Sequence, residues 1–195
     1  GCHDDQFVLR NSTADRNYLV PPFASAGWAR VMRRIVDAEK IDLVLPASDG
    51  DVAGLSRARA RLGGRVFLPR PATVDLCGDK YRLSERLRAA GVPAPATYRI
   101  TDVRSLEAIF RRLGNPARAW CRIRAGAGSR GALPVGSPEQ ARSWITYWRD
   151  MRGVPVTAFT LSEYLPGRDF GGQQCAGSRE LLPAERADRE HCRFC

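Results

Sequence analysis

The sequence predicts an α/β fold that contains a parallel sheet in its first part. Helical and strand-like segments alternate with tight connections over residues 25–68, which is typical of strand–helix units. The helical segments repeat apolar side chains every three or four residues, and the strand segments are short apolar runs. The 195 residues, 44% of them hydrophobic, are enough for one large domain or two small ones.

A helix over residues 25–39 is the clearest element of the first part, and Ser25 is expected to cap it. Its apolar side chains share one helical face: Trp28, Val31, Met32, Ile35 and Val36. The other elements expected here are a strand at 7–9, a strand at 41–46, a helix at 52–62, a strand at 66–68 and a Pro-containing linker at 69–75.

The segment Ala47–Asp51 follows one of these strands. Ligands of parallel α/β sheets bind at the carboxyl ends of the strands, which makes this segment a candidate ligand contact. A Ser followed by acidic residues is equally typical of a simple helix cap. Both interpretations stay open on the sequence.

The second part begins with a helix from Asp79 to Ala90, which Gly91 and the prolines beyond it end. The elements expected after it are a strand at 97–100, a helix at 103–113, strands at 118–124 and 132–135, a helix at 138–149 and a strand at 156–165. From residue 171 onward the chain is polar and weakly periodic, and we expect an irregular tail.

The glycine-rich stretch Arg122–Gly131 joins two of these strands. Glycine suits a backbone that turns through positive φ or approaches a ligand, successive N–H groups can form a nest for an anion, and arginine suits phosphate. The string 126–131 matches the dinucleotide fingerprint Gly-x-Gly-x-x-Gly, but a Pro-containing strand follows it instead of a helix. We therefore expect a phosphate-binding hairpin loop, with an ordinary flexible loop as the alternative.

The formal charge is +10, yet lysine occurs only at Lys40 and Lys80. Lys80 is accordingly either a phosphate ligand or a solvated helix residue. The arginines are scattered and few aromatic residues lie among them, which disfavours nucleic acid as a partner. No apolar run is long enough to span a membrane, and the polar, acidic N-terminus has no signal-peptide pattern, so we expect a cytoplasmic protein with free thiols.

The tail offers one alternative site. Cys175, His191, Cys192 and Cys195 include a Cys-x-x-Cys, which occurs in zinc sites. A second paired knuckle is missing, however, and we predict no metal ligands.

Five motifs in order resemble the ATP-grasp superfamily, on its carbamoyl-phosphate-synthetase-like and carboxylate–amine ligase side, over roughly residues 35–170. They are Ile41–Asp49, Asp79–Lys80 with Leu83 and Leu87, the exit 91–95, the loop 124–131 and Ser162–Gly167 with Asp169 beyond it. The resemblance implies a partial Rossmann-like pre-ATP-grasp domain over residues 1–73, the N-terminal and lid region of an ATP-grasp domain over 74–170, and a tail over 171–195.

The resemblance also implies a site for ATP. The loop 124–131, the family's lid loop, would contact the phosphates, and the segment Ser162–Gly167, the family's hinge, would contact the adenine. Its residues would be Lys80, Arg122, Gly126, Gly128, Ser129, Gly131, Glu163, Tyr164, Leu165 and Asp169. Many family members have a lysine followed by proline where this chain has Arg122–Ile123. Glu163 would either accept the adenine amino group or face solvent.

The implied reaction is an ATP-dependent ligation. ATP phosphorylates a small carboxylate to an acyl phosphate, and an amine or a thiol displaces the phosphate. The family's Mg²⁺ ligands lie downstream of the hinge, and only 25 residues follow Phe170, so we expect no identifiable Mg²⁺ ligands and no catalytic half in this chain. The alternative is a truncated, non-catalytic nucleotide-binding fragment.

Overall fold

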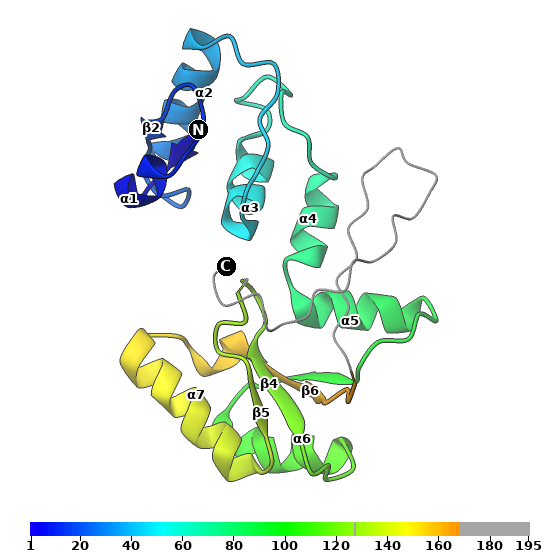
Figure 1. Ribbon diagram of the computed structural model, residues 1–195. Coiled ribbons are helices and arrows are strands. Elements are labelled where there is room, and N and C mark those ends of the chain that lie inside the picture. Colours follow the sequence, from blue (N-terminus) through cyan, green and yellow to red (C-terminus); the bar gives the residue numbers. More distant parts are fainter. Residues whose placement is uncertain (127, 168–195) are drawn as a thin grey trace.

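The computed structural model describes residues 1–126 and 128–167, which form a mainly helical first part and a second part built on a sheet (Figure 1). The secondary structure of the first part, in chain order, is β1 (Cys2–His3), α1 (Gln6–Arg10), β2 (Tyr18–Leu19), α2 (Trp28–Ala38), α3 (Asp49–Ala58) and α4 (Pro71–Cys77). Strands β1 and β2 are parallel, and one isolated parallel bridge joins Val44 to Val66.

The first part has its own small core, formed where α2 and α3 bury the predicted apolar positions. The buried residues are Val20, Trp28, Met32, Val36, Leu55, Ala58, Leu62 and Val66. Trp28, Met32 and Val36 lie on the helical face that the sequence predicts. The periodicity of α2 is therefore confirmed, although the helix begins at Trp28 and not at Ser25.

Three predictions for the first part are wrong. Residues 7–9 are helical, because the Asp5 side chain caps α1 by accepting from the Phe7 N–H at 2.7 Å. The expected strands at 41–46 and 66–68 shorten to the single bridge between Val44 and Val66. The expected linker at 69–75 contains most of α4, which Pro71 opens at a position where proline suits the first turn of a helix.

The second part contains α5 (Lys80–Ala89), β3 (Thr97–Arg99), the 3-10 helix η1 (Val103–Ser105), α6 (Leu106–Arg112), β4 (Ala119–Ile123), β5 (Leu133–Val135), α7 (Pro138–Arg152), the 3-10 helix η2 (Val156–Ala158) and β6 (Phe159–Glu163). Four strands form one antiparallel sheet in the order β3-β6-β4-β5. The sequence-predicted order of elements is confirmed here. The last strand is shorter than expected because η2 precedes it.

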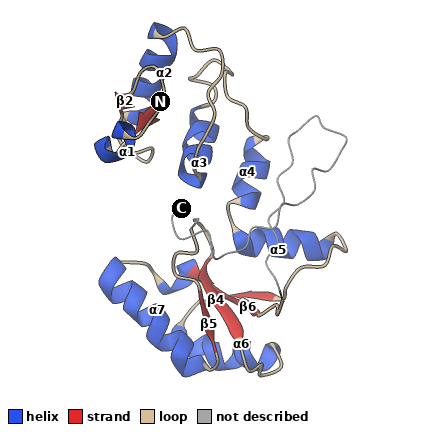
Figure 2. Ribbon diagram, viewed as in Figure 1, coloured by secondary structure: helices blue, strands red, loops and turns tan. Residues whose placement is uncertain are grey.

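Helices α6 and α7 pack on one face of this sheet (Figure 2). Their buried side chains are Leu106, Ile109, Phe110, Ala141 and Ile145, and the strands contribute Ala119, Cys121, Val135, Phe159 and Leu161. Neighbouring side chains on a strand point to opposite faces, so Trp120 and Arg122 of β4 point away from these helices. The helices thus leave the second face of the sheet for other contacts.

Replacement of Ile145 by alanine is expected to lower the free energy of unfolding by about 2–5 kcal/mol, because its side chain is fully buried in this core. Met151→Ala on the same helix is the matched control, since Met151 is 66% exposed and should change stability by less than about 0.5 kcal/mol. Urea titration followed by tryptophan fluorescence measures both. Equal effects would contradict the assignment of the buried face of α7.

Candidate functional site

A cleft of about 650 Å³ lies on the face of the sheet that α6 and α7 leave uncovered. Trp120 and Arg122 of β4 and Ser162 of β6 line it, and the register that pairs Trp120 with Ser162 places them beside one another. The glycine loop, the start of α5 and the segment after β6 complete its walls. The cleft therefore joins elements that are far apart in the sequence.

Most of the sequence-predicted site residues line this cleft. They are Lys80, Arg122, Gly126, Gly128, Ser129, Glu163, Tyr164 and Leu165. Gly131 is not among the lining residues and lies at the far end of the loop, against Ile123. Asp169 lies outside the described residues.

The Asp79 side chain forms hydrogen bonds with both the start of α5 and the start of the glycine loop. Its carboxylate caps the helix by accepting from the N–H groups of Tyr81 and Arg82, at 3.1 and 3.2 Å. The same carboxylate accepts hydrogen bonds from both Nε and Nη2 of Arg124. The Lys80 N–H donates to the carbonyl of Arg124 at 2.9 Å, which brings the two segments together through the backbone as well.

The pKa of Asp79 is lowered although the group is partly buried. Burial alone would raise it, but the hydrogen bonds from Arg124 and from the backbone N–H groups of Arg82 and Tyr81, with the Arg124 charge, outweigh burial. The Asp79 side chain is 15% exposed, so water screens this interaction only partly. The ion pair is therefore a structural link at the edge of the cleft.

Two cations gather beside the loop. Lys80 Nζ donates to the carbonyl of Gly126 at 2.5 Å. Burial and the nearby charge of Arg122 lower the pKa of Lys80, and the carboxylates of Asp49 and Asp79 oppose this shift. Burial likewise lowers the pKa of Arg122, whose Nε has no hydrogen-bond partner among the described residues. Two adjacent and partly desolvated cations favour an anion in the cleft.

The loop itself adopts conformations that favour glycine. Gly126, Gly128 and Gly131 have φ angles of +113°, +67° and +68°, and Ser129 also has a positive φ of +52°. At Gly131 a Cβ atom would come within 2.7 Å of Cγ1 and Cδ1 of Ile123, whereas no atom of the described residues lies within 4 Å of such an atom at Gly128. Gly131 is thus required by packing in addition to conformation.

Glu163, the last residue of β6, is exposed, as one of its two expected arrangements has it, and its carboxylate also bonds to the backbone. Its Oε2 accepts from the Ala96 N–H at 2.6 Å, and its own N–H donates to the Ala96 carbonyl at 3.0 Å. The carboxylate is therefore already hydrogen-bonded to the backbone before β3. Tyr164 lies with its ring centroid 6.2 Å from that of Trp120, and the Arg118 guanidinium lies 5.9 Å from the same Tyr164 ring.

Three further lining residues lie in segments that the sequence analysis singled out without naming them as site residues: Asp49 in 47–51, Arg130 in the loop 124–131 and Ser162 in the motif 162–167. Asp49 lines the cleft, as the ligand-contact interpretation of 47–51 expects. Sequence reasoning missed Trp120, although it lies two residues before Arg122 in a strand and must share its face.

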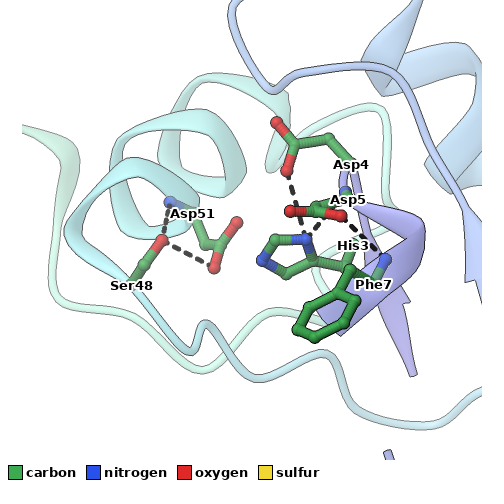
Figure 3. Close-up of polar contacts among 6 residues, drawn as sticks. All are labelled: His3, Asp4, Asp5, Phe7, Ser48 and Asp51. Atoms are coloured by element: carbon green, nitrogen blue, oxygen red, sulfur yellow. Dashed lines mark hydrogen bonds and ion pairs between the residues drawn. The ribbon is translucent and has the colours of Figure 1, made fainter. Parts of the chain in front are cut away.

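The segment 47–51 both caps a helix and borders cavities. Ser48 Oγ accepts from the Asp51 N–H at 3.1 Å and donates to the Asp51 carboxylate at 2.8 Å. Figure 3 shows this cap opposite His3, whose Nδ1 accepts from the Asp5 N–H at 2.8 Å. Ser48, Asp51 and His3 line a second cavity of about 980 Å³, and Asp49 lines the cleft described above.

The carboxylates of the cleft are few among the described residues. Only two carboxylates, Asp49 and Glu163, line the cleft within residues 1–126 and 128–167, and Glu163 is bonded to Ala96. In the same ranges no group of three His, Cys, Asp or Glu side chains is placed to hold a metal ion. The cysteines of the alternative zinc site lie outside the described residues. None of the described helices combines the length and apolar character needed to cross a membrane.

No family model matches the sequence, but solved structures share its fold. The biotin carboxylase domain of 2-oxoglutarate carboxylase from Hydrogenobacter thermophilus has a TM-score of 0.62 at 19% identity, over 78% of this chain and 35% of its own. Carboxyaminoimidazole ribonucleotide synthase from Aspergillus clavatus has a TM-score of 0.60 at 15% identity, over 84% of this chain and 40% of its own. L-amino acid ligase from Bacillus licheniformis has a TM-score of 0.60 at 16% identity, over 80% of this chain and 34% of its own. The chain therefore spans less than half the length of these structures.

Replacement of Gly131 by alanine is expected to destabilise the protein more than replacement of Gly128. Both substitutions put a side chain at nearly the same positive φ, which costs about 1–2 kcal/mol. Only the Cβ at residue 131 meets Ile123, so Gly131→Ala should cost about 1–3 kcal/mol more. Chemical denaturation compares the two variants, and equal losses would contradict the packing of Gly131 on Ile123.

Asp79→Asn is expected to lose about 1–3 kcal/mol of stability at neutral pH, because asparagine still caps α5 but loses the charge that pairs with Arg124. The folded pKa of Asp79 is lowered, so its contribution is complete above the unfolded pKa of about 3.9 and disappears as pH falls through the folded value. The difference in the free energy of unfolding between wild type and Asp79→Asn should therefore vanish at pH values below the folded pKa of Asp79. Denaturant titrations across the pH range measure it.

Asp75→Asn is the control for this pH series, since Asp75 is exposed and has no side-chain hydrogen bond or ion pair among the described residues. The free energy of unfolding of Asp75→Asn should equal that of the wild type at every pH. A gap between wild type and Asp79→Asn that persists below the folded pKa would show that the loss does not come from the carboxylate charge.

Proposed function

Because the chain has the ATP-grasp fold, we propose that it binds ATP in the cleft beside the glycine loop. The phosphates would lie against Lys80, Arg122 and the loop residues 126 and 128–131. The adenine would lie at the hinge 163–165, where backbone groups can meet its edge and Tyr164 or Leu165 can pack near the ring. Asp169 would contact the ribose.

One observation carries this proposal: Lys80 and Arg122 come from different elements and converge beside a loop of positive-φ residues. Such a loop can present backbone N–H groups to an anion, and the two cations add charge that suits a polyphosphate. The Lys80 ammonium, which donates to the Gly126 carbonyl, would exchange that carbonyl for a phosphate oxygen.

The neighbouring structures support a nucleotide as the anion. The Hydrogenobacter structure contains MgADP, ADP and bicarbonate, and the Aspergillus structure contains ATP. By analogy, we propose that the parent reaction is a ligation, in which a small carboxylate attacks the terminal phosphate of ATP and gives an acyl phosphate and ADP. An amine or thiol then forms a bond to the acyl carbon, and inorganic phosphate leaves.

The residues of this chain would orient ATP for that reaction and neutralise its phosphate charge. Lys80 and Arg122 would neutralise the phosphate oxygens, and the hinge would fix the base, which orients the terminal phosphate. Mg²⁺ would neutralise further phosphate charge, and among the described residues no group of three His, Cys, Asp or Glu side chains is placed to hold it. The proposed division into a pre-ATP-grasp part over 1–73 and a lid region over 74–170 places a boundary within α4.

Mg-ATP is expected to raise the thermal stability of the folded chain. A ligand whose free concentration is 100 times its dissociation constant raises the free energy of unfolding by about 2.7 kcal/mol, and a thermal-shift assay detects a change of this size. Lys80→Ala should reduce this shift because it removes a phosphate contact. Lys40→Ala, at the only other lysine of the chain, should leave it unchanged.

Duplex DNA tests the alternative function, nucleic-acid binding, which the net charge of +10 suggests. If DNA stabilises the folded protein and millimolar Mg-ATP does not, the nucleotide proposal fails in favour of nucleic-acid binding. An equal ATP shift in Lys80→Ala and wild type would remove Lys80 from the site.

A further inference from the structure

We infer that Trp144 is a positioning residue that holds the far end of the glycine loop in place for phosphate binding. This inference rests on the proposed nucleotide function of the cleft. Its basis is a single hydrogen bond: the Trp144 indole Nε1–H donates to the Gly131 carbonyl at 3.0 Å. Trp144 belongs to α7, which lies on the opposite face of the sheet from the cleft.

The two ends of the loop are held in different ways. At the first end, Asp79 pairs with Arg124, and Lys80 bonds to the backbone of residues 124 and 126. At the far end, the Trp144 indole donates to Gly131. Within the described ranges, no other hydrogen bond joins residues 128–131 to a residue beyond the loop. The Ala132 N–H bond to Ser129 stays within the turn.

The indole is itself well fixed, so it can determine where the loop ends. Its ring stacks on Tyr147 at 5.9 Å and meets Trp148 edge-on at 5.9 Å, and the side chain packs against the core beneath the sheet. Gly131 also packs closely on Ile123 and Phe159, which a Cβ atom at this position would meet. Its carbonyl is therefore fixed by Trp144 of α7 next to residues of the sheet.

A loop that is already ordered loses less conformational freedom when a ligand binds, so the affinity is higher. The N–H groups of this loop would face the phosphates, whereas adenosine would contact the hinge. Loss of the Trp144 N–H should therefore weaken the binding of Mg-ATP and leave the binding of adenosine unchanged.

The test compares Trp144→Phe with Trp148→Phe in the full chain by calorimetric titration. Both variants keep an aromatic ring on α7, but Trp148 Nε1 is buried and has no hydrogen-bond partner among the described residues, so only Trp144→Phe removes a bond. Trp144→Phe is expected to weaken Mg-ATP binding about three- to tenfold, the range expected for one hydrogen bond, and Trp148→Phe less than about twofold. Neither should change adenosine binding.

Amide hydrogen exchange without nucleotide supplies a readout that does not depend on ATP. Exchange over residues 128–132 should be faster in Trp144→Phe and unchanged in Trp148→Phe. If Phe at 144 prevents folding, the indole N–H resonance of Trp144 in the wild type is the second measurement, and it should shift with Mg-ATP but not with adenosine.

Equal weakening of Mg-ATP and adenosine, equal effects of the two variants, or unchanged loop exchange would overturn the role of Trp144. A wild-type protein that binds no Mg-ATP would instead overturn the proposed function. Loop exchange would in that case still report whether Trp144 holds Gly131.

Discussion

The shared carboxylate of Asp79 is the contact on which the arrangement of the cleft depends. It caps α5 and pairs with Arg124, so a single side chain joins the start of a helix to the end of a strand that is distant in sequence. Lys80 follows directly, and its own N–H bond to the Arg124 carbonyl and its Nζ bond to Gly126 add to this junction. Since Asp79 is partly buried, loss of Arg124 would leave a partly desolvated carboxylate without its counter-charge.

The two faces of the antiparallel sheet have different surroundings. One face carries the apolar side chains that pack against α6 and α7, and the other carries Trp120, Arg122 and Ser162 toward the cleft. Strand alternation alone produces this division. The sheet can therefore place the partly buried Arg122 at the cleft without interrupting its apolar core. The link from Trp144 to Gly131 joins α7 to the loop.

The second part was more predictable than the first because its signals are local. Asp79 and Gly91 delimit α5, and regular apolar spacing marks α6 and α7. In the first part, the apolar run at 41–46 resembles a strand, but a strand needs partners along its length. Only Val44 finds one, at Val66, so the expected parallel sheet reduces to short pairings. The helix at 6–10 depended on a cap from Asp5, which outweighed a short apolar run.

The sequence by itself determined the order of the elements in the second part, the glycines of the loop and the lysine and arginine beside it, because these depend on local conformation and residue chemistry. Only the tertiary structure decided that the start of α3 reaches the cleft, that the Glu163 carboxylate bonds to Ala96, and that Gly131 contacts both Ile123 and Trp144. Those contacts join residues that are distant along the chain. Their partners are selected by the packing of whole elements, for which no short stretch of sequence contains a signal.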